Sequence, residues 1–203
     1  MLPLHVAAVA MGCLILAEPA AAGVNPGRAW LDRQGYAPPT GSQILACHGY
    51  GCTRRTPIPI EAEWLRRAAA ILRAAKASPL SEREALRTVM RLYTGTLAAA
   101  FGGTWDAPRS PPSLSGRQGQ MDCLDTTANT VSLLLVLEET GALTHHRTAP
   151  PRSRGIFLDG RYPHFTAVII EKASGRLWAI DPWTRPPGQE PEILPLRRWQ
   201  EAT

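Results

Sequence analysis

The sequence predicts an α+β fold, in which helices come first along the chain and an antiparallel sheet follows. Between about 59 and 140, apolar residues recur at the three- and four-residue spacing of helices. After about 144 they fall instead in short runs separated by glycine, proline and charged residues, which is typical of strands. The chain has no internal repeat. One group of helices packed on one sheet is therefore the expected architecture.

Two amphipathic helices are expected in the first half of the chain. The first covers about 59–77, and the second begins at Ser81, because Glu84 lies three residues later and completes a capping box. Each has apolar residues on one side. They are Trp64, Ala68, Ile71, Leu72 and Ala75 in the first helix, and Leu86, Val89, Met90, Tyr93 and Leu97 in the second. The chain from Gly23 to about Gln43 is rich in proline and glycine and is expected to be extended.

A third helix is expected from Cys123 to Thr140. Asp122 is a residue type favoured at the N-cap, and Gly141 is one favoured at the C-cap. Apolar residues occur on nearly all sides of this helix, so it should be central and buried. The loop at 101–118, rich in glycine, proline and serine, leads directly into it, and loops of this length are often functional.

Strands are expected after the third helix. They cover about 144–148, 155–159, 164–171 and 176–181, and the segment 192–199 is expected to be a short strand and a closing turn. If residues 172–175 form the turn, antiparallel register puts Asp181 opposite Thr166. His164 and Thr166 point to the same face, so Asp181 and His164 become diagonal neighbours within reach of each other. A slip of one residue would send Asp181 to the other face.

Composition bounds the class of protein. The chain of 203 residues suits one domain with a substantial core, and 44% of its residues are hydrophobic, as in globular proteins. The formal net charge of +5 comes from arginines scattered along the sequence. No dense Lys/Arg block with interleaved aromatic residues occurs, so no nucleic-acid partner is expected.

The segment 1–22 is expected to be a signal peptide, followed by a single domain at 23–203. Residues 6–17 are apolar, and Ala20 to Ala22 offer a small-residue cleavage site, although no Lys or Arg precedes the apolar run. A lipid anchor at Cys13 and a retained anchor are the alternatives. The mature chain is expected in the periplasm or outside the cell, without a stable membrane span.

Export leaves three cysteines in the mature chain. Cys47 and Cys52 are separated by a segment with two glycines that permits a tight turn, so a local disulfide is expected. Two buried free thiols, or half of a metal site with His48, are the alternatives. Cys123 then remains as an odd thiol, which is either reactive or buried.

Cys123, His164 and Asp181 have the chain order of a nucleophile, a base and the group that orients the base. A thiol in the first turn of a helix lies near exposed backbone N–H groups and the positive end of the helix dipole, which both favour the thiolate. Taken singly, each residue has a structural explanation: a buried cysteine, a polar strand residue and a turn residue. Their order and the strand register together favour a catalytic triad.

An oxyanion hole would need two donors. The backbone N–H of Cys123 is one, and the side chain of Gln118 or of Gln120 is a candidate for the second. Asp106, in the preceding loop, is expected to be a turn residue rather than a site residue. His145 and His146 are expected at the surface or at the helix end.

The motifs resemble a known family. Cys123 at a helix start, the run from His164 to Glu171, and the segment Leu177 to Trp183 together resemble the transglutaminase-like superfamily, and within it the bacterial transglutaminase-like cysteine peptidases. The resemblance covers about 120–183. It implies a papain-like fold, with the cysteine helix packed on an antiparallel sheet, and a Cys–His–Asp triad.

The resemblance also implies a ligand and a class of substrate. Known members include periplasmic proteases that act on surface adhesins and need calcium, with acidic residues around the active cysteine taking part in calcium binding. Asp122 and Asp125 flank Cys123 in a similar way and offer the hard oxygen ligands that calcium prefers. The chemistry itself requires no cofactor.

The sequence thus favours an exported cysteine hydrolase, a peptidase or amidase, that acts on a protein or peptide. Acyl transfer to an amine by the same triad is the first alternative. The second is a catalytically inactive binding module of the same fold.

Overall fold

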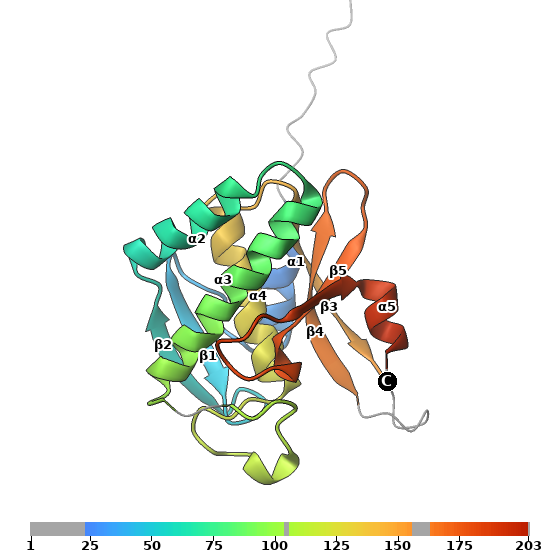
Figure 1. Cartoon of the computed structure of the whole chain (residues 1–203). Coiled ribbons are helices and arrows are strands. Elements are labelled where there is room, and N and C mark those ends of the chain that lie inside the picture. Colours follow the sequence, from blue (N-terminus) through green and yellow to red (C-terminus); the bar gives the residue numbers. More distant parts are fainter. Residues whose placement is uncertain (1–22, 104–105, 156–162, 203) are drawn as a thin grey trace, which may run out of the picture.

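The computed structural model describes residues 23–103, 106–155 and 163–202, and Figure 1 shows their arrangement. These residues form a mixed α+β fold, as the sequence predicts, and it contains five α-helices and two antiparallel sheets among the described residues. The expected signal peptide at 1–22 and most of the expected strand at 155–159 lie outside the described residues. The elements are α1 (Pro26–Arg33), β1 (Gln43–His48), β2 (Arg54–Pro59), α2 (Ala62–Ala74), α3 (Pro79–Ala100), α4 (Cys123–Glu139), β3 (His146–Arg154), β4 (His164–Glu171), β5 (Leu177–Asp181), β6 (Glu192–Pro195) and α5 (Leu196–Glu201).

Helix α4 is the centre of the molecule, as expected. It contacts α1, β1, β3 and β4, and Figure 1 shows it behind α3 and beside the four-stranded sheet. Nearly all of its side chains are buried, including Val131 and the run from Leu133 to Leu137. Each such aliphatic side chain contributes roughly 1.5–3 kcal/mol when it leaves water. Asp122 caps the helix, because its Oδ1 accepts the backbone N–H of Asp125 at 2.8 Å.

Two expectations for the first hundred residues are wrong. The segment from Gly23 to Gln43 is not simply extended, since it contains α1, where the Asn25 side chain accepts the backbone N–H of Gly27 and Pro26 opens the helix. Helix α3 begins before Ser81, because the hydroxyl of Ser78 accepts the backbone N–H of Ser81 and serves as the N-cap.

The strands β1 and β2 have no counterpart in the sequence prediction. They form a two-stranded sheet in which Gln43 pairs with Pro59 and His48 pairs with Arg54. Because β2 continues to Pro59, helix α2 begins at Ala62 rather than at 59. The two prolines of β2 weaken its strand pattern in the sequence.

The larger sheet has the order β3-β4-β5-β6, with all neighbours antiparallel. Ala167 pairs with Ile180, and continuing this register places Thr166 opposite Asp181, so the predicted register is confirmed. The strand expected at 144–148 is the first part of a longer strand, β3, which begins at His146, continues to Arg154 and has a register shift between Ala149 and Arg152. The prolines in this interval are tolerated because β3 is an edge strand.

The two faces of this sheet are covered differently. Helix α4 packs on one face, where Ala167, Ile169 and Ile180 join the main core. Helix α5 packs on the other face, in a smaller cluster with Val168 and Ala179. Among the described helices, none has the length and apolar character to cross a membrane.

Asn129 joins α4 to β1. Its Oδ1 accepts the backbone N–H of Cys47 at 2.7 Å, and its Nδ2 donates to the carbonyl of the same residue at 2.8 Å. The buried amide therefore pairs with the strand backbone as a neighbouring strand would.

We expect Asn129→Leu to lower the free energy of unfolding by about 2–4 kcal/mol, because both backbone groups of Cys47 would be left buried without partners. Urea denaturation measures the loss. As a control on the same helix, Glu139→Gln removes only an exposed ion pair with Arg28 and should cost less than about 1 kcal/mol. A similar small loss for both variants would contradict this account of Asn129.

Candidate active site

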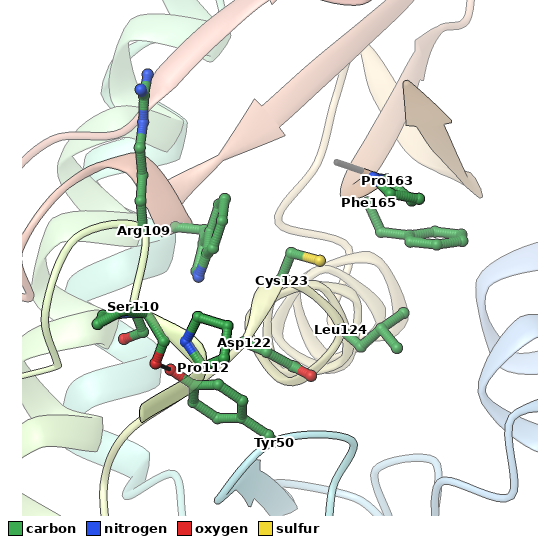
Figure 2. Close-up of a pocket in the computed structure, with 11 residues that line it drawn as sticks. Tyr50, Arg109, Ser110, Pro112, Asp122, Cys123, Leu124, Pro163 and Phe165 are labelled. Carbon is green, nitrogen blue, oxygen red and sulfur yellow. Dashed lines mark hydrogen bonds between the residues drawn. The ribbon is translucent and has the colours of Figure 1, made fainter. Parts of the chain in front are cut away.

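The free thiol of the described chain lies at the edge of a pocket. Cys123 is the first residue of α4, is 7% exposed and forms no disulfide. The neighbouring pocket has a volume of about 490 Å³. Figure 2 shows the sulfur pointing toward Pro163 and Phe165, while the guanidinium of Arg109 points away from it. The pocket is lined by Tyr50, Arg109, Ser110, Pro111, Pro112, Asp122, Cys123, Leu124, Pro163, Phe165 and Trp183.

The surroundings of the thiol keep it neutral. Burial raises the pKa of Cys123 to about 11, and the charges of Asp122 and Asp181 act in the same direction. The backbone N–H of Phe165, which hydrogen-bonds the sulfur, and the N–H of Cys123 itself oppose this effect. At neutral pH the resting protein therefore holds a thiol rather than a thiolate.

The predicted pairing of His164 with Asp181 is present. The Nε2 atom of His164 lies 2.7 Å from Oδ2 of Asp181, and both residues are buried. Since the carboxylate can only accept, the ring donates from Nε2, which leaves the lone pair on Nδ1. Nδ1 is buried and has no hydrogen-bond partner among the described residues. The imidazole is thus held in the tautomer that can take a proton at Nδ1.

No hydrogen bond joins the Cys123 thiol to the His164 imidazole among the described residues. Cys123 instead contacts the backbone of Phe165, the residue after His164. The alternation along β4 and β5 places His164 and Asp181 on the sheet face that α5 covers, whereas α4 packs on the opposite face. The two sites therefore approach each other only at the end of the sheet, where β4 begins.

Two tryptophans that the sequence analysis missed complete this region. Trp183 lines the pocket, and its ring lies 4.6 Å from the ring of His164. Trp199, on α5, donates its indole N–H to Oδ2 of Asp181 at 2.8 Å. The position of Trp183 two residues after Asp181 was a signal that could have found it. No local pattern points to Trp199, because α5 reaches the site only through the folding of the sheet.

The expected disulfide between Cys47 and Cys52 is confirmed, and its loop is attached to the start of α4. Oδ2 of Asp122 accepts the backbone N–H of Gly51, and the two oxygens of Asp125 accept those of Tyr50 and Cys52. Burial and the charge of Asp122 raise the pKa of Asp125 to about 7, while these N–H donors lower it.

The residues present do not fit a calcium site. Calcium takes six to eight oxygen ligands, whereas each carboxylate oxygen of Asp122 and Asp125 already accepts a backbone N–H. The one cluster of potential metal ligands in the described chain is Cys47, Cys52 and Asp125, and its two sulfurs are joined in the disulfide. Calcium dependence stays a prediction, and no chemical step is derived through the ion.

Gln118 and Gln120 were predicted as candidate oxyanion-hole donors, but neither of them lines the pocket. The Nε2 atom of Gln118 donates to the carbonyl of Phe101 at 3.4 Å. Gln120 is buried, and its Oε1 accepts the backbone N–H of Ala107 and the hydroxyl of Ser110. The role of the Cys123 backbone N–H as an oxyanion donor stays a prediction.

Asp106 is not the turn residue that was expected. Its buried Oδ1 accepts the backbone N–H of Met121 and the hydroxyl of Ser110, each at 2.8 Å. Burial raises its pKa to about 6 against the effect of these two hydrogen bonds. Asp106 thus attaches the long loop to the residues that precede Cys123.

The expectation of a surface or helix-end histidine is wrong for His146. It is fully buried at the start of β3, and its Nδ1 lies 2.8 Å from Oε1 of Glu82. Glu82 also accepts the backbone N–H groups of Thr144, His145 and His146. The sequence analysis did not single out Glu82, because its partners lie far along the chain, at Thr144, His145 and His146.

Comparisons with known proteins return no match: no family model fits the chain, and neither the curated proteins nor the solved structures contain one similar to it. The function must be argued from the site itself.

We expect iodoacetamide to label Cys123 slowly at about pH 7, and the rate to rise about tenfold per pH unit until it levels off above about pH 11. The reason is the pKa of about 11, which leaves little thiolate at lower pH. Mass spectrometry of the non-reduced protein measures the rate, and Cys123→Ser is the blank. A plateau reached at about pH 6 would instead reveal a thiolate paired with an imidazolium.

Proposed function

We propose that this protein is an exported cysteine hydrolase, a peptidase or amidase, that acts on a protein or peptide through Cys123, His164 and Asp181. The observation that carries the proposal is the hydrogen bond between His164 and Asp181. His164 begins strand β4, and the backbone N–H of the next residue, Phe165, hydrogen-bonds the Cys123 sulfur. A buried imidazole with a fixed tautomer and a free lone pair on Nδ1 has the properties of a general base.

In the proposed reaction, the thiol of Cys123 attacks the substrate carbonyl while its proton passes to Nδ1 of His164. Collapse of the tetrahedral intermediate expels the amine, which takes the proton from His164. Water then attacks the thioester, gives its proton to His164, and releases the acid and the free thiol. Asp181 holds the ring and stabilises its charged form. Because the resting thiol is neutral, proton transfer accompanies the attack.

The missing hydrogen bond between Cys123 and His164 is compatible with this scheme, since catalytic hydrogen bonds in ligand-free enzymes are often long and tighten when substrate binds. The backbone N–H of Cys123 at the helix start supports the forming oxyanion. The apolar wall of the pocket, which includes Leu124, Phe165 and Trp183, suits a substrate side chain.

We also propose that the fold is of the papain-like or transglutaminase-like type. The packing of the cysteine helix α4 on an antiparallel sheet that carries the histidine and the aspartate supports this assignment. The Cys47–Cys52 disulfide supports an oxidising compartment such as the periplasm or the cell exterior.

A second candidate function is a binding module that has kept this fold without catalysis. The specific observation in its favour is the raised pKa of the buried Cys123, which lacks a hydrogen bond to His164 among the described residues. Such a module would hold its ligand in the same pocket.

Acylation by p-nitrophenyl acetate tests the proposal. We expect the wild-type protein to carry an acetyl group on Cys123 during turnover, and Cys123→Ala to lose all activity while it still folds. His164→Ala should slow acylation by about 10²–10⁴-fold, because the general base is gone. Asp181→Ala should lose less activity than Cys123→Ala, since Asp181 acts by orienting the His164 ring. Mass spectrometry and nitrophenolate release provide the measurements.

His145→Ala is the matched control, because this partly exposed ring contacts the carbonyl of Lys76 and lies outside the pocket. An active Cys123→Ala variant would exclude the mechanism. If the wild-type protein is never acylated, the binding module is the better conclusion. Partition of the acyl-enzyme between water and an added amine separates hydrolysis from acyl transfer.

A further inference from the structure

We propose that Trp199 is a positioning residue for the proposed triad: through its indole N–H it sets the orientation and the effective charge of Asp181, and thereby the hydrogen bond that orients His164. The effect on catalysis rests on the proposed function. The hydrogen bond between Trp199 and Asp181 is observed in the structure and does not depend on that function.

Trp199 and His164 share one acceptor. Oδ2 of Asp181 accepts the indole N–H of Trp199 at 2.8 Å and the Nε2 proton of His164 at 2.7 Å. Asp181 is 2% exposed and Trp199 is 1% exposed, so water does not compete for these hydrogen bonds. Hydrogen bonds to a buried charged group are stronger than those between neutral groups.

The rings also restrict His164. The ring centroid of Trp199 lies 5.4 Å from that of His164, and the centroid of Trp183 lies 4.6 Å from it. The imidazole is thus in contact with two tryptophans. Its remaining polar atom, Nδ1, is the one that the proposed reaction uses.

Trp199 is itself fixed in place. The guanidinium of Arg154 lies over its ring at 4.5 Å from the centroid and donates to the carbonyl of Trp199 at 2.7 Å. Arg154 lies on β3 directly opposite His164 in the sheet. Leu196, one turn earlier on α5, packs in the same cluster as Trp199. Strand and helix together therefore hold the indole N–H toward Asp181.

The Trp199 N–H affects both the rotation and the charge of the Asp181 carboxylate. A carboxylate with one donor can rotate about its last bond, whereas a second fixed donor on the same oxygen restricts that rotation. The Trp199 N–H also offsets part of the negative charge on Oδ2, which weakens the hold of Asp181 on a protonated His164. Without this donor, Asp181 should attract a proton on the imidazole more strongly, which would move the pH dependence of the reaction upward.

Other ionisable groups face this pair. Arg154 approaches from β3, the Cys123 thiol approaches from α4, and Glu192 on β6 lies opposite Asp181 and is paired with Arg185. Replacing Trp199 by phenylalanine changes none of their charges. A shift in pH dependence in that variant is therefore assigned to the lost N–H.

The test is Trp199→Phe, with Trp178→Phe as the matched control. Both changes remove an indole N–H from a buried tryptophan under an arginine, but the Nε1 atom of Trp178 has no hydrogen-bond partner in the described chain. For hydrolysis of p-nitrophenyl acetate, Trp199→Phe should lower kcat about tenfold, with KM little changed, and should move the acid limb of the pH–rate profile upward by about half a pH unit. Trp178→Phe should leave the limb in place.

An equal pH profile in Trp199→Phe and wild type would overturn the proposal, as would a loss that appears only in KM. If the Trp199 variant does not fold, the wild-type protein and Asp181→Asn give the answer by NMR. The indole N–H resonance of Trp199 should lie downfield in the wild type and move upfield when its acceptor loses its charge. An unmoved resonance would exclude the hydrogen bond.

The NMR measurement needs no activity. Absence of wild-type acylation would overturn the proposed function, while the resonance of Trp199 would still decide its contact with Asp181. The two failures are therefore distinguishable.

Discussion

The burial of helix α4 on nearly all sides is the constraint on which the rest of the structure depends. The backbone N–H groups at the start of a buried helix, and those of the loops around it, are shielded from water and need hydrogen-bond acceptors from the protein. Asp122 and Asp125 supply them, since their oxygens accept N–H groups from the helix and from the disulfide loop. The same two carboxylates that could suggest a metal site instead attach the loop of a two-stranded sheet to the start of helix α4.

This attachment also shapes the pocket. Tyr50, at the tip of the disulfide loop, lines the pocket beside Cys123, and its hydroxyl donates to the carbonyl of Pro111 on the opposite loop. Asp106 connects that loop to Met121. The surroundings of Cys123 are therefore built by segments far apart in the sequence, and their burial is what raises the pKa of the thiol. The enclosure of Cys123 and its protonated thiol therefore have the same physical origin.

How much could be predicted differs between the helices and the site. The central helix and its N-cap followed from a capping residue beside a continuous apolar run, and the apolar stripe of α3 is buried as predicted. The register of β4 and β5 followed from one turn and the alternation of side chains. In contrast, β1 and β2 were missed, because the two prolines of β2 obscure its strand pattern and the backbone of Cys47 on β1 pairs with the side chain of Asn129, far away in the sequence.

The sequence by itself determined the local features: where α4 begins, which cysteines pair, and that His164 and Asp181 would be neighbours, because each depends on residues close together or on a single turn. Only the tertiary structure decided which face of the sheet carries that pair, which tryptophans enclose it, and that the Cys123 thiol contacts Phe165 rather than the imidazole. These contacts depend on how α4 and α5 pack on opposite faces of one sheet. Side-chain burial across the whole fold sets that packing, and no short segment encodes it.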